Sequence, residues 1–340
     1  MIAILKIWSR KDQILIPVVA FVFISFFVGY RYQIGVDWVT YEIIFLDNVR
    51  SPLLEAVAQG DSAYSLINWI VGRLGGQVWD VNLICAGIFS FGLIQFCRSL
   101  HRPGLALAVA TPTLIIITAM GYTRQSVAVG CIMMACHTFR GSIHWKWVAW
   151  LCFSVLFHKS AILVFPAFIL AAAHNRWITI VVGGAIAAAV VVLVVSRGLG
   201  ETLALYLEGD IDSSGALPRI AVGAIAGVAF FLNGDRASIF EHRLALYRNM
   251  CVLMIMLLPL YFVFPSRTIL DRVGILVVPF QSVAYVGLAE FLYRKARVLE
   301  LPFTAIIMVA YGAQLAIWLL FATFSEYWIP YENAIWIKWI

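Results

Sequence analysis

Long apolar runs separated by short polar stretches make up most of the chain. A helix that crosses a hydrocarbon core of about 30 Å needs about 20 apolar residues, and roughly 17 suffice. Runs of this kind lie near 14–30, 80–97, 104–121, 124–139, 147–157, 160–173, 177–196, 219–232, 250–265, 273–292 and 302–324. The run at 147–157 gives the weakest signal. The pattern predicts an all-α, polytopic integral membrane protein with about 11–12 transmembrane helices.

The stretch at 62–75 has a different pattern. Its apolar residues follow the i, i+3, i+4, i+7 spacing of one helical face, and they are Ala63, Leu66, Ile67, Ile70, Val71 and Leu74. Asp61 or Ser62 could cap the start of this helix. Because the stretch is too short to span comfortably, we expect an interfacial or re-entrant helix on the extracytoplasmic side.

Composition supports the membrane assignment. The 340 residues are 63% apolar and only 12% charged, whereas ordinary soluble domains carry about 25% charged residues. No polar stretch is long enough to fold outside the membrane, so residues 1–340 form a single transmembrane domain with extracytoplasmic loops near 31–61 and 197–218. The basic residues are scattered between apolar runs, so we expect no nucleic-acid partner. The six cysteines form no CxxC pair, and we expect no metal site.

Lysine and arginine positions favour a cytoplasmic N-terminus. With that orientation, 14 of the 24 basic residues lie on the cytoplasmic side, as the positive-inside rule requires. The ten outer basic residues are Arg31, Arg50, Arg73, Arg124, Lys159, Arg197, Arg219, Arg267, Arg272 and Lys338. Because the rule disfavours them, another role must retain them.

The first outer constellation is residues 31–41, directly after the first apolar run. Gly35 permits a tight turn that would bring Arg31 and Asp37 together. The planar fork of an arginine binds two phosphate oxygens at once, and a nearby carboxylate can act as a general base. The alternative is an interfacial Arg–Asp pair with an aromatic belt that anchors the helix.

Two more constellations lie between apolar runs. Arg124 and Gln125 open a helix, where a cation opposes the helix dipole, and that cost argues for a bound anion. His158 can take and give a proton near neutral pH, and Lys159 follows it. An ionisable residue at membrane depth is a functional hypothesis by default. If the turn lies at the surface, His158 and Lys159 are merely solvated.

The other outer segments are less specific. Residues 208–219 form a polar loop that ends at Arg219, and its acidic residues suit solvation better than a divalent metal. Arg267 and Arg272 follow at a helix end, and the aromatic stretch 325–333 is typical of an interface belt. Together, several outer arginines with a His and an Asp suit a polyanionic amphiphile such as a lipid-linked pyrophosphate. The chain has no GxxxxGK[ST] and no GxGxxG after a strand, so no nucleotide site is indicated.

At these residues the chain resembles the EpsG family of Wzy-type polysaccharide polymerases. The resemblance runs across most of the chain and rests on Arg31-x-x-x-Gly35-x-Asp37-x-x-x-Tyr41, Thr123-Arg124-Gln125-Ser126-x-Ala128, and His158-Lys159-Ser160-Ala161 leading into Pro166. The usual Asp-Tyr appears here as Asp37-Trp38, a mild departure that leaves the acid in place.

The resemblance implies glycosyl transfer at the outer face of a bacterial inner membrane. Such proteins join oligosaccharide repeat units carried on undecaprenyl pyrophosphate, as in O-antigen (lipopolysaccharide) or exopolysaccharide synthesis. The growing chain leaves its lipid and passes to a sugar hydroxyl of the next lipid-linked unit. The implied partners are this donor, this acceptor and membrane lipid. The resemblance also allows a chain-length regulator as a further partner. No nucleotide sugar, metal or other cofactor is expected.

Roles follow as hypotheses. Arg124, Arg267 and Arg272, with Arg31, would hold the donor pyrophosphate and stabilise its charge as it leaves. His158 is the first choice as general base, because Asp37 beside Arg31 would have a low pKa. Asp37 would then orient the acceptor or an arginine. Further substrate contacts are expected from Tyr41, Gln125, Lys159 and Arg219.

Four alternatives remain open. A lipid-linked oligosaccharide flippase or transporter would use the same outer arginines, although it should also show internal repeats and polar residues deep within spans. An O-antigen ligase would differ only in its acceptor. A membrane acyltransferase would share the outer His and Arg. A non-catalytic assembly subunit would tolerate replacement of the arginines.

Overall fold

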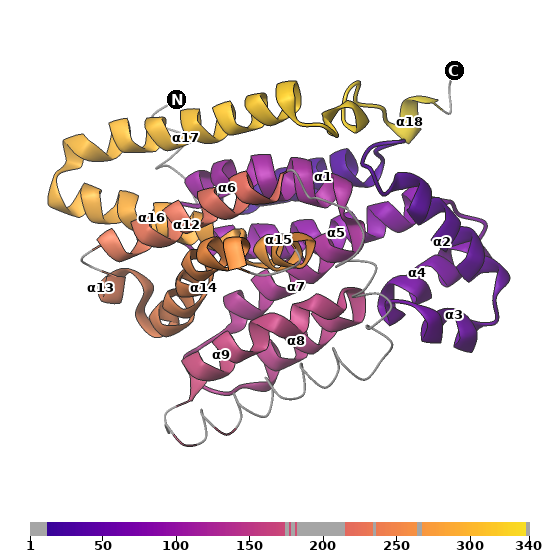
Figure 1. Ribbon diagram of the computed structural model, residues 1–340, viewed down its shortest axis with the longest axis horizontal. Coiled ribbons are helices and arrows are strands. Elements are labelled where there is room, and N and C mark those ends of the chain that lie inside the picture. Colours follow the sequence, from indigo (N-terminus) through magenta and orange to yellow (C-terminus); the bar gives the residue numbers. More distant parts are fainter. Residues whose placement is uncertain are drawn as a thin grey trace.

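The computed structural model describes residues 12–173, 215–233, 236–263 and 267–337, together with positions 177 and 181, and these form a bundle of helices (Figure 1). The elements are α1 (Asp12–Gly29), α2 (Trp38–Arg50), α3 (Leu53–Gln59), α4 (Ser62–Arg73), α5 (Val78–Arg98), α6 (Pro103–Ala110), the π-helix η2 (Thr111–Ala119), α7 (Thr123–Thr138), α8 (Trp145–Phe157), the 3₁₀-helix η3 (Lys159–Val164), α9 (Phe165–Ala172), α12 (Ala216–Leu232), α13 (Arg236–Phe240), η4 (Glu241–Arg243), α14 (Leu244–Val263), α15 (Arg267–Val277), α16 (Pro279–Lys295), α17 (Arg297–Phe321), η5 (Ser325–Tyr327) and α18 (Ala334–Ile337). The all-α, polytopic membrane class is confirmed.

Three described helices are long and apolar enough to cross a membrane: Val78–Arg98, Ser238–Val263 and Arg297–Phe321. A fourth span results if Ile269–Val277 and Pro279–Lys295, bent by 42° at their junction, count as one. The remaining apolar runs in the described part form helices of 10–17 residues. The expected run at 177–196 lies outside the described residues apart from two isolated positions, so the total of about 11–12 spans stays a prediction.

Helices α5 and α7 form the centre of the bundle. A Cβ atom added at Gly92 would lie 2.1 Å from the carbonyl oxygen of Gly130, so the two backbones meet where neither residue has a side chain. Small residues allow this close approach between membrane helices. Almost every residue of α7 is buried as a result, and Arg124 at its start is the main exception.

The segment 31–61, expected as an outer loop, contains the helices α2 and α3. With α4 they lie together at one end of the molecule (Figure 1). The buried residues of α2 are Trp38, Tyr41, Phe45 and Asn48, which recur every three or four positions. The helix expected near 62–75 is present as α4. Its interfacial or re-entrant placement stays a prediction.

The C-terminal segment packs against the turn that follows α1. The backbone N–H of Tyr32 donates to the carbonyl of Glu332 at 2.9 Å, and that of Gly35 donates to Tyr327 at 3.0 Å. The indole of Trp328 is buried, and its Nε1 donates to the carbonyl of Ile116 at 2.9 Å. The expectation of an interface belt is therefore wrong for Trp328, which anchors the chain end inside the bundle.

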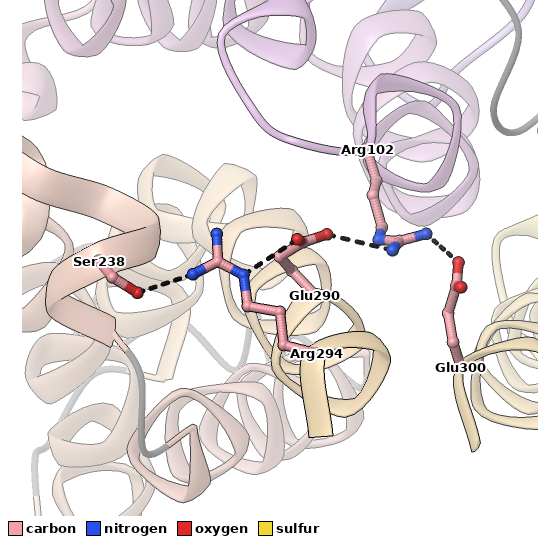
Figure 2. A network of polar contacts seen from close by, with 5 residues as sticks. All are labelled: Arg102, Ser238, Glu290, Arg294 and Glu300. Atoms are coloured by element: carbon pink, nitrogen blue, oxygen red, sulfur yellow. Dashed lines mark hydrogen bonds and ion pairs between the residues drawn. The ribbon is translucent and has the colours of Figure 1, made fainter. Parts of the chain in front are cut away.

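A polar network joins α6, α13, α16 and α17 at the opposite end of the molecule from α2–α4 (Figure 1). Arg102 pairs with Glu300 and, at 3.1 Å, with Glu290. Arg294 donates to Glu290 at 3.2 Å and to Ser238 at 2.9 Å, which completes the chain of contacts in Figure 2. The positive-inside count of the sequence analysis places both Arg102 and Arg294 on the cytoplasmic side. Which end faces the cytoplasm stays a prediction.

Candidate functional site

The three constellations singled out from the sequence line one cavity of about 300 Å³. Helices α2, α7 and α15 and the 3₁₀-helix η3 supply its walls. The lining residues are Asp37, Tyr41, Tyr122, Arg124, Gln125, His158, Ser160, Leu163, Ile269, Arg272 and Val273. Segments more than 200 residues apart in the chain thus place two arginines, a carboxylate and an imidazole around one space.

The turn at Gly35 sets the position of Asp37. Gly35 has φ +96°, and a Cβ atom there would lie 2.8 Å from the carbonyl oxygen of Met120, so the turn packs directly on the backbone before α7. Asp37 follows as the N-cap residue of α2, with no side-chain cap hydrogen bond. Burial raises the pKa of the Asp37 carboxyl, and the charges of Arg272 and Arg124 oppose that rise. The expected low pKa beside Arg31 is wrong.

Arg31 lies behind the cavity wall rather than in it. Its side chain is only 1% exposed, and Nη1 donates to the carbonyl of Val28 at 2.8 Å. Nη2 donates to the hydroxyl of Thr123 at 2.6 Å, beside Asn82. The expected approach of Arg31 to Asp37 and its contact with substrate are therefore replaced by a structural role. Arg31 ties the end of α1 to the start of α7.

Arg124 reaches across to the lobe of α2–α4. Its Nη1 donates to Oδ2 of Asp61 at 2.9 Å, and its guanidinium lies 5.8 Å from the ring centre of Tyr41. Asp61 was expected at most to cap α4, but its side chain makes no cap hydrogen bond. Burial raises the pKa of Asp61, with Arg124 and Lys159 opposing. Sequence reasoning missed this pair, although an arginine at the unfavourable end of a helix signals a nearby anion.

Gln125 and Arg272 hold each other across the cavity wall. The amide nitrogen of Gln125 donates to the backbone carbonyl of Arg272 at 2.6 Å, and Nη1 of Arg272 donates to the amide oxygen of Gln125 at 3.4 Å. The Arg272 guanidinium also stacks 4.5 Å from the ring centre of Tyr122. These contacts fix the plane of the guanidinium, which leaves its charge available to the cavity.

His158 lies between α8 and η3 at the cavity edge. Its Nδ1 is 2.6 Å from the hydroxyl of Ser160. Burial, together with the charges of Arg272 and Arg124, lowers the pKa of His158 to about 3. The imidazole is therefore neutral near pH 7, and it is a weaker base than an ordinary histidine.

A family model described as the EpsG family matches residues 14–333, a range that contains the whole cavity. The chain belongs to the EpsG family. No curated protein and no solved structure matches it. Membership supports a polysaccharide polymerase-like, glycosyltransferase-like function in general, and it makes this a bacterial membrane protein.

Three other expected contacts lie outside the lining of this EpsG-family cavity. Arg219 forms an ion pair with Asp271 at 2.9 Å and lines a different cavity. Arg267 is exposed at the start of α15, where it stacks 5.3 Å from the ring centre of Tyr261. Lys159 is exposed next to His158. Most of the expected loop 197–218 lies outside the described residues.

The charges that line the EpsG-family site suit the binding of an anion and the transfer of a proton. Within the described ranges, no group of three or more His, Cys, Asp or Glu side chains could hold a metal ion. Two guanidinium groups and one carboxylate line a small, partly buried space. In such a space, charge interactions are stronger than in water. The arrangement can bind a phosphate-bearing group and accept a proton beside it.

Proposed function

We propose that this EpsG-family protein is a polymerase that joins undecaprenyl-pyrophosphate-linked oligosaccharide repeat units at the extracytoplasmic face of the inner membrane. The observation that carries the proposal is the single cavity in which Arg124, Arg272, Asp37 and His158 meet. The family supports the polymerase-like activity. The charge of the cavity supports a lipid-linked pyrophosphate as the donor. The positive-inside count supports the extracytoplasmic face as the place of the reaction.

The two arginines bind the donor. Planar guanidinium groups match phosphate oxygens in pairs, and charge-assisted bonds of this kind are the strong ones. Arg272 is fixed in place by Gln125 and Tyr122, whereas Arg124 pairs with Asp61, a contact that the donor must share or replace. Donors fixed before the reaction stabilise the charge that builds on the departing pyrophosphate without reorganising.

Asp37 accepts the proton of the acceptor hydroxyl. The hydroxyl oxygen bonds to the anomeric carbon of the donor, the bond from that carbon to pyrophosphate breaks, and its electron pair leaves with the pyrophosphate. Burial raises the pKa of Asp37, whereas that of His158 is lowered to about 3. Asp37 is therefore the better base of the two, which reverses the order expected from the sequence.

His158 positions the acceptor. Its neutral ring, fixed by Ser160 at 2.6 Å, can hydrogen-bond a sugar hydroxyl and hold it near Asp37. A bound pyrophosphate would neutralise Arg124 and Arg272, which lower the pKa of His158. Donor binding would thus make His158 more basic and strengthen this contact.

A polymer ladder tests the proposal. Cells lacking the native protein are complemented with wild type, Asp37→Asn, Arg272→Ala or His158→Ala, and membrane levels of each variant are checked. Arg267→Ala is the matched control, since it removes an arginine from the same helix without touching the cavity. We expect the first three to give single repeat units and the control to give a full ladder.

The same experiment separates the alternatives. Single repeat units at the cell surface mean that transfer across the membrane and ligation both work, which excludes a flippase and a ligase as the altered step. Loss of all surface repeat units in the three variants would favour those functions instead. An undiminished ladder in all three would refute the proposed site.

A further inference from the structure

A second cavity, of about 530 Å³, lies along α17 beside the start of α12 and the π-helix η2. We call it the α17 groove. Its lining consists of Thr113, Ile117, Gly215, Pro218, Arg219, Ala310, Ala313, Gln314, Ile317, Trp318, Phe321, Ala322 and Thr323. Most of these side chains are apolar. The groove is larger than the candidate active site, and none of its lining residues belongs to that site.

The α17 groove faces the surroundings of the bundle. In the most apolar stretch of α17 only 17% of the residues are buried inside the protein, against 61% in that of α5. Helix α17 also runs along the edge of the molecule in Figure 1. Ala310, Ala313 and Ile317 line the groove and are exposed. In a membrane protein, such a face meets lipid, so the groove is open to a hydrocarbon chain that enters from the bilayer.

Among the described residues that line the groove, the one charged side chain, Arg219, is already paired with a carboxylate. Arg219 pairs with Asp271 at 2.9 Å, and their side chains are 9% and 5% exposed. A phosphate that captured Arg219 would leave Asp271 buried without its counter-charge, which is costly. The groove therefore suits an apolar chain rather than the pyrophosphate itself, whose place is at Arg124 and Arg272.

Two elements reach both the groove and the candidate active site. Asp271 and Arg272 are consecutive on α15: the first holds Arg219 of the groove, and the second lines the reaction cavity. Along the other wall, η2 contributes Ile117 to the groove, and the chain then continues to Tyr122 in the cavity. The groove and the cavity therefore share neighbouring elements, and this is the basis for assigning the head and the tail of one amphiphile to them.

We infer that the α17 groove binds the isoprenoid chain of the lipid-linked donor. The inference rests on the proposed function and adds where the lipid part of that substrate lies. Lipid tails are as apolar as the groove, so selectivity comes from packing and shape rather than from escape from water. The long π-helix in its wall agrees with this role, since π-helical turns occur frequently at functional sites.

Binding of two probes tests the inference. Undecaprenyl pyrophosphate carries the full chain, whereas geranyl pyrophosphate carries the same head on a chain too short to fill the groove. The purified protein in lipid nanodiscs is compared as wild type, Ala313→Trp and Ala316→Trp. Ala313 lines the groove, and Ala316 is an exposed alanine of the same helix that does not.

We expect Ala313→Trp to bind undecaprenyl pyrophosphate about tenfold more weakly and geranyl pyrophosphate unchanged. Ala316→Trp should match wild type with both probes. Equal binding of the long probe by Ala313→Trp and wild type would overturn the inference, as would equal losses for both probes. A competition experiment gives a further check, with phospholipid and undecaprenyl phosphate as the two competitors. If phospholipid displaced the long probe as effectively as undecaprenyl phosphate, the groove would hold any acyl chain and the inference would be overturned.

A separate variant keeps the proposed function distinguishable. Arg272→Ala removes a cavity arginine and leaves the groove intact. If it leaves the binding of both probes unchanged, the pyrophosphate site is refuted whatever Ala313→Trp does. If it weakens both probes while Ala313→Trp weakens neither, only the groove inference fails.

Discussion

The carboxylate of Asp61 lies 2.9 Å from Nη1 of Arg124, so an internal anion already occupies one of the two arginines of the candidate active site. A donor pyrophosphate must share or replace this contact. Asp61→Asn keeps a hydrogen-bond acceptor and removes the competing charge. We predict that it tightens the binding of undecaprenyl pyrophosphate by about tenfold. Equilibrium binding to the purified protein measures the change.

A control makes the Asp61 result specific. Asp47→Asn removes the same charge from an exposed site on α2 and should leave the dissociation constant unchanged. If Asp61→Asn weakens binding instead, Asp61 serves to orient Arg124 rather than to compete for it.

The turn at Gly35 gives a second prediction. A side chain there would adopt φ +96° and would meet the carbonyl oxygen of Met120 at 2.8 Å. Gly35→Ala should therefore lower the free energy of unfolding by about 1–3 kcal/mol and displace Asp37. Thermal denaturation in detergent measures the loss. Gly87→Ala is the control: Gly87 lies within α5 with open space around its Cβ position, so this change should not destabilise.

Much of this arrangement could be predicted from the sequence, because it depends on local signals. The apolar runs predicted α1, α5, α7 and α17 close to their observed positions. Arg124 and His158 lie at the ends of predicted apolar runs and Asp37 lies in a predicted outer loop, so the sequence predicts all three on the same side of the membrane. The structure then brings the three side chains together in one cavity.

The rest depends on contacts between distant residues. The burial of Arg31 requires Thr123, 92 positions later, and Arg219 is withdrawn from the active site by Asp271, 52 positions later. No local pattern marks either partner. The helix α2 was not predicted for a different reason. Its buried face includes Trp38, Tyr41 and Asn48, whose polar or interfacial side chains do not form an apolar run.

The pKa of Asp37 predicts the acid limb of the pH profile. Burial raises this pKa above the ordinary 3.8, and the base must be ionised to accept a proton. Activity is then present above the raised pKa and is lost as the pH falls through it. We predict that kcat/KM, measured with lipid-linked donor and acceptor in vesicles, falls on an acid limb centred above pH 3.8.

The His158 variant tests the assignment of that limb. If His158 were the base, the limb would lie at about pH 3 and would disappear in His158→Gln. We expect His158→Gln to lower kcat/KM and keep the limb, because Asp37 remains. A limb that shifts or vanishes in His158→Gln would move the role of base to His158.

The network around Arg102 gives the last prediction, and it concerns stability rather than chemistry. Arg102 pairs with Glu290 and Glu300 from two different helices, and its side chain is 10% exposed, against 15% and 18% for the two glutamates (Figure 2). Arg102→Met would leave Glu300 without this partner in a poorly hydrated site, whereas Glu290 would keep Arg294 at 3.2 Å. We predict a loss of about 2–4 kcal/mol in the free energy of unfolding, seen as a lower melting temperature in detergent.

Adding Glu300→Gln to Arg102→Met should recover part of the loss, because the isolated charge is then gone. The binding of geranyl pyrophosphate should be unchanged in both variants, since the network lies at the opposite end of the molecule from the α2–α4 lobe that holds Arg124. No recovery in the double variant would mean that Arg102 stabilises through packing on Tyr293, whose ring centre lies 5.2 Å away, rather than through charge.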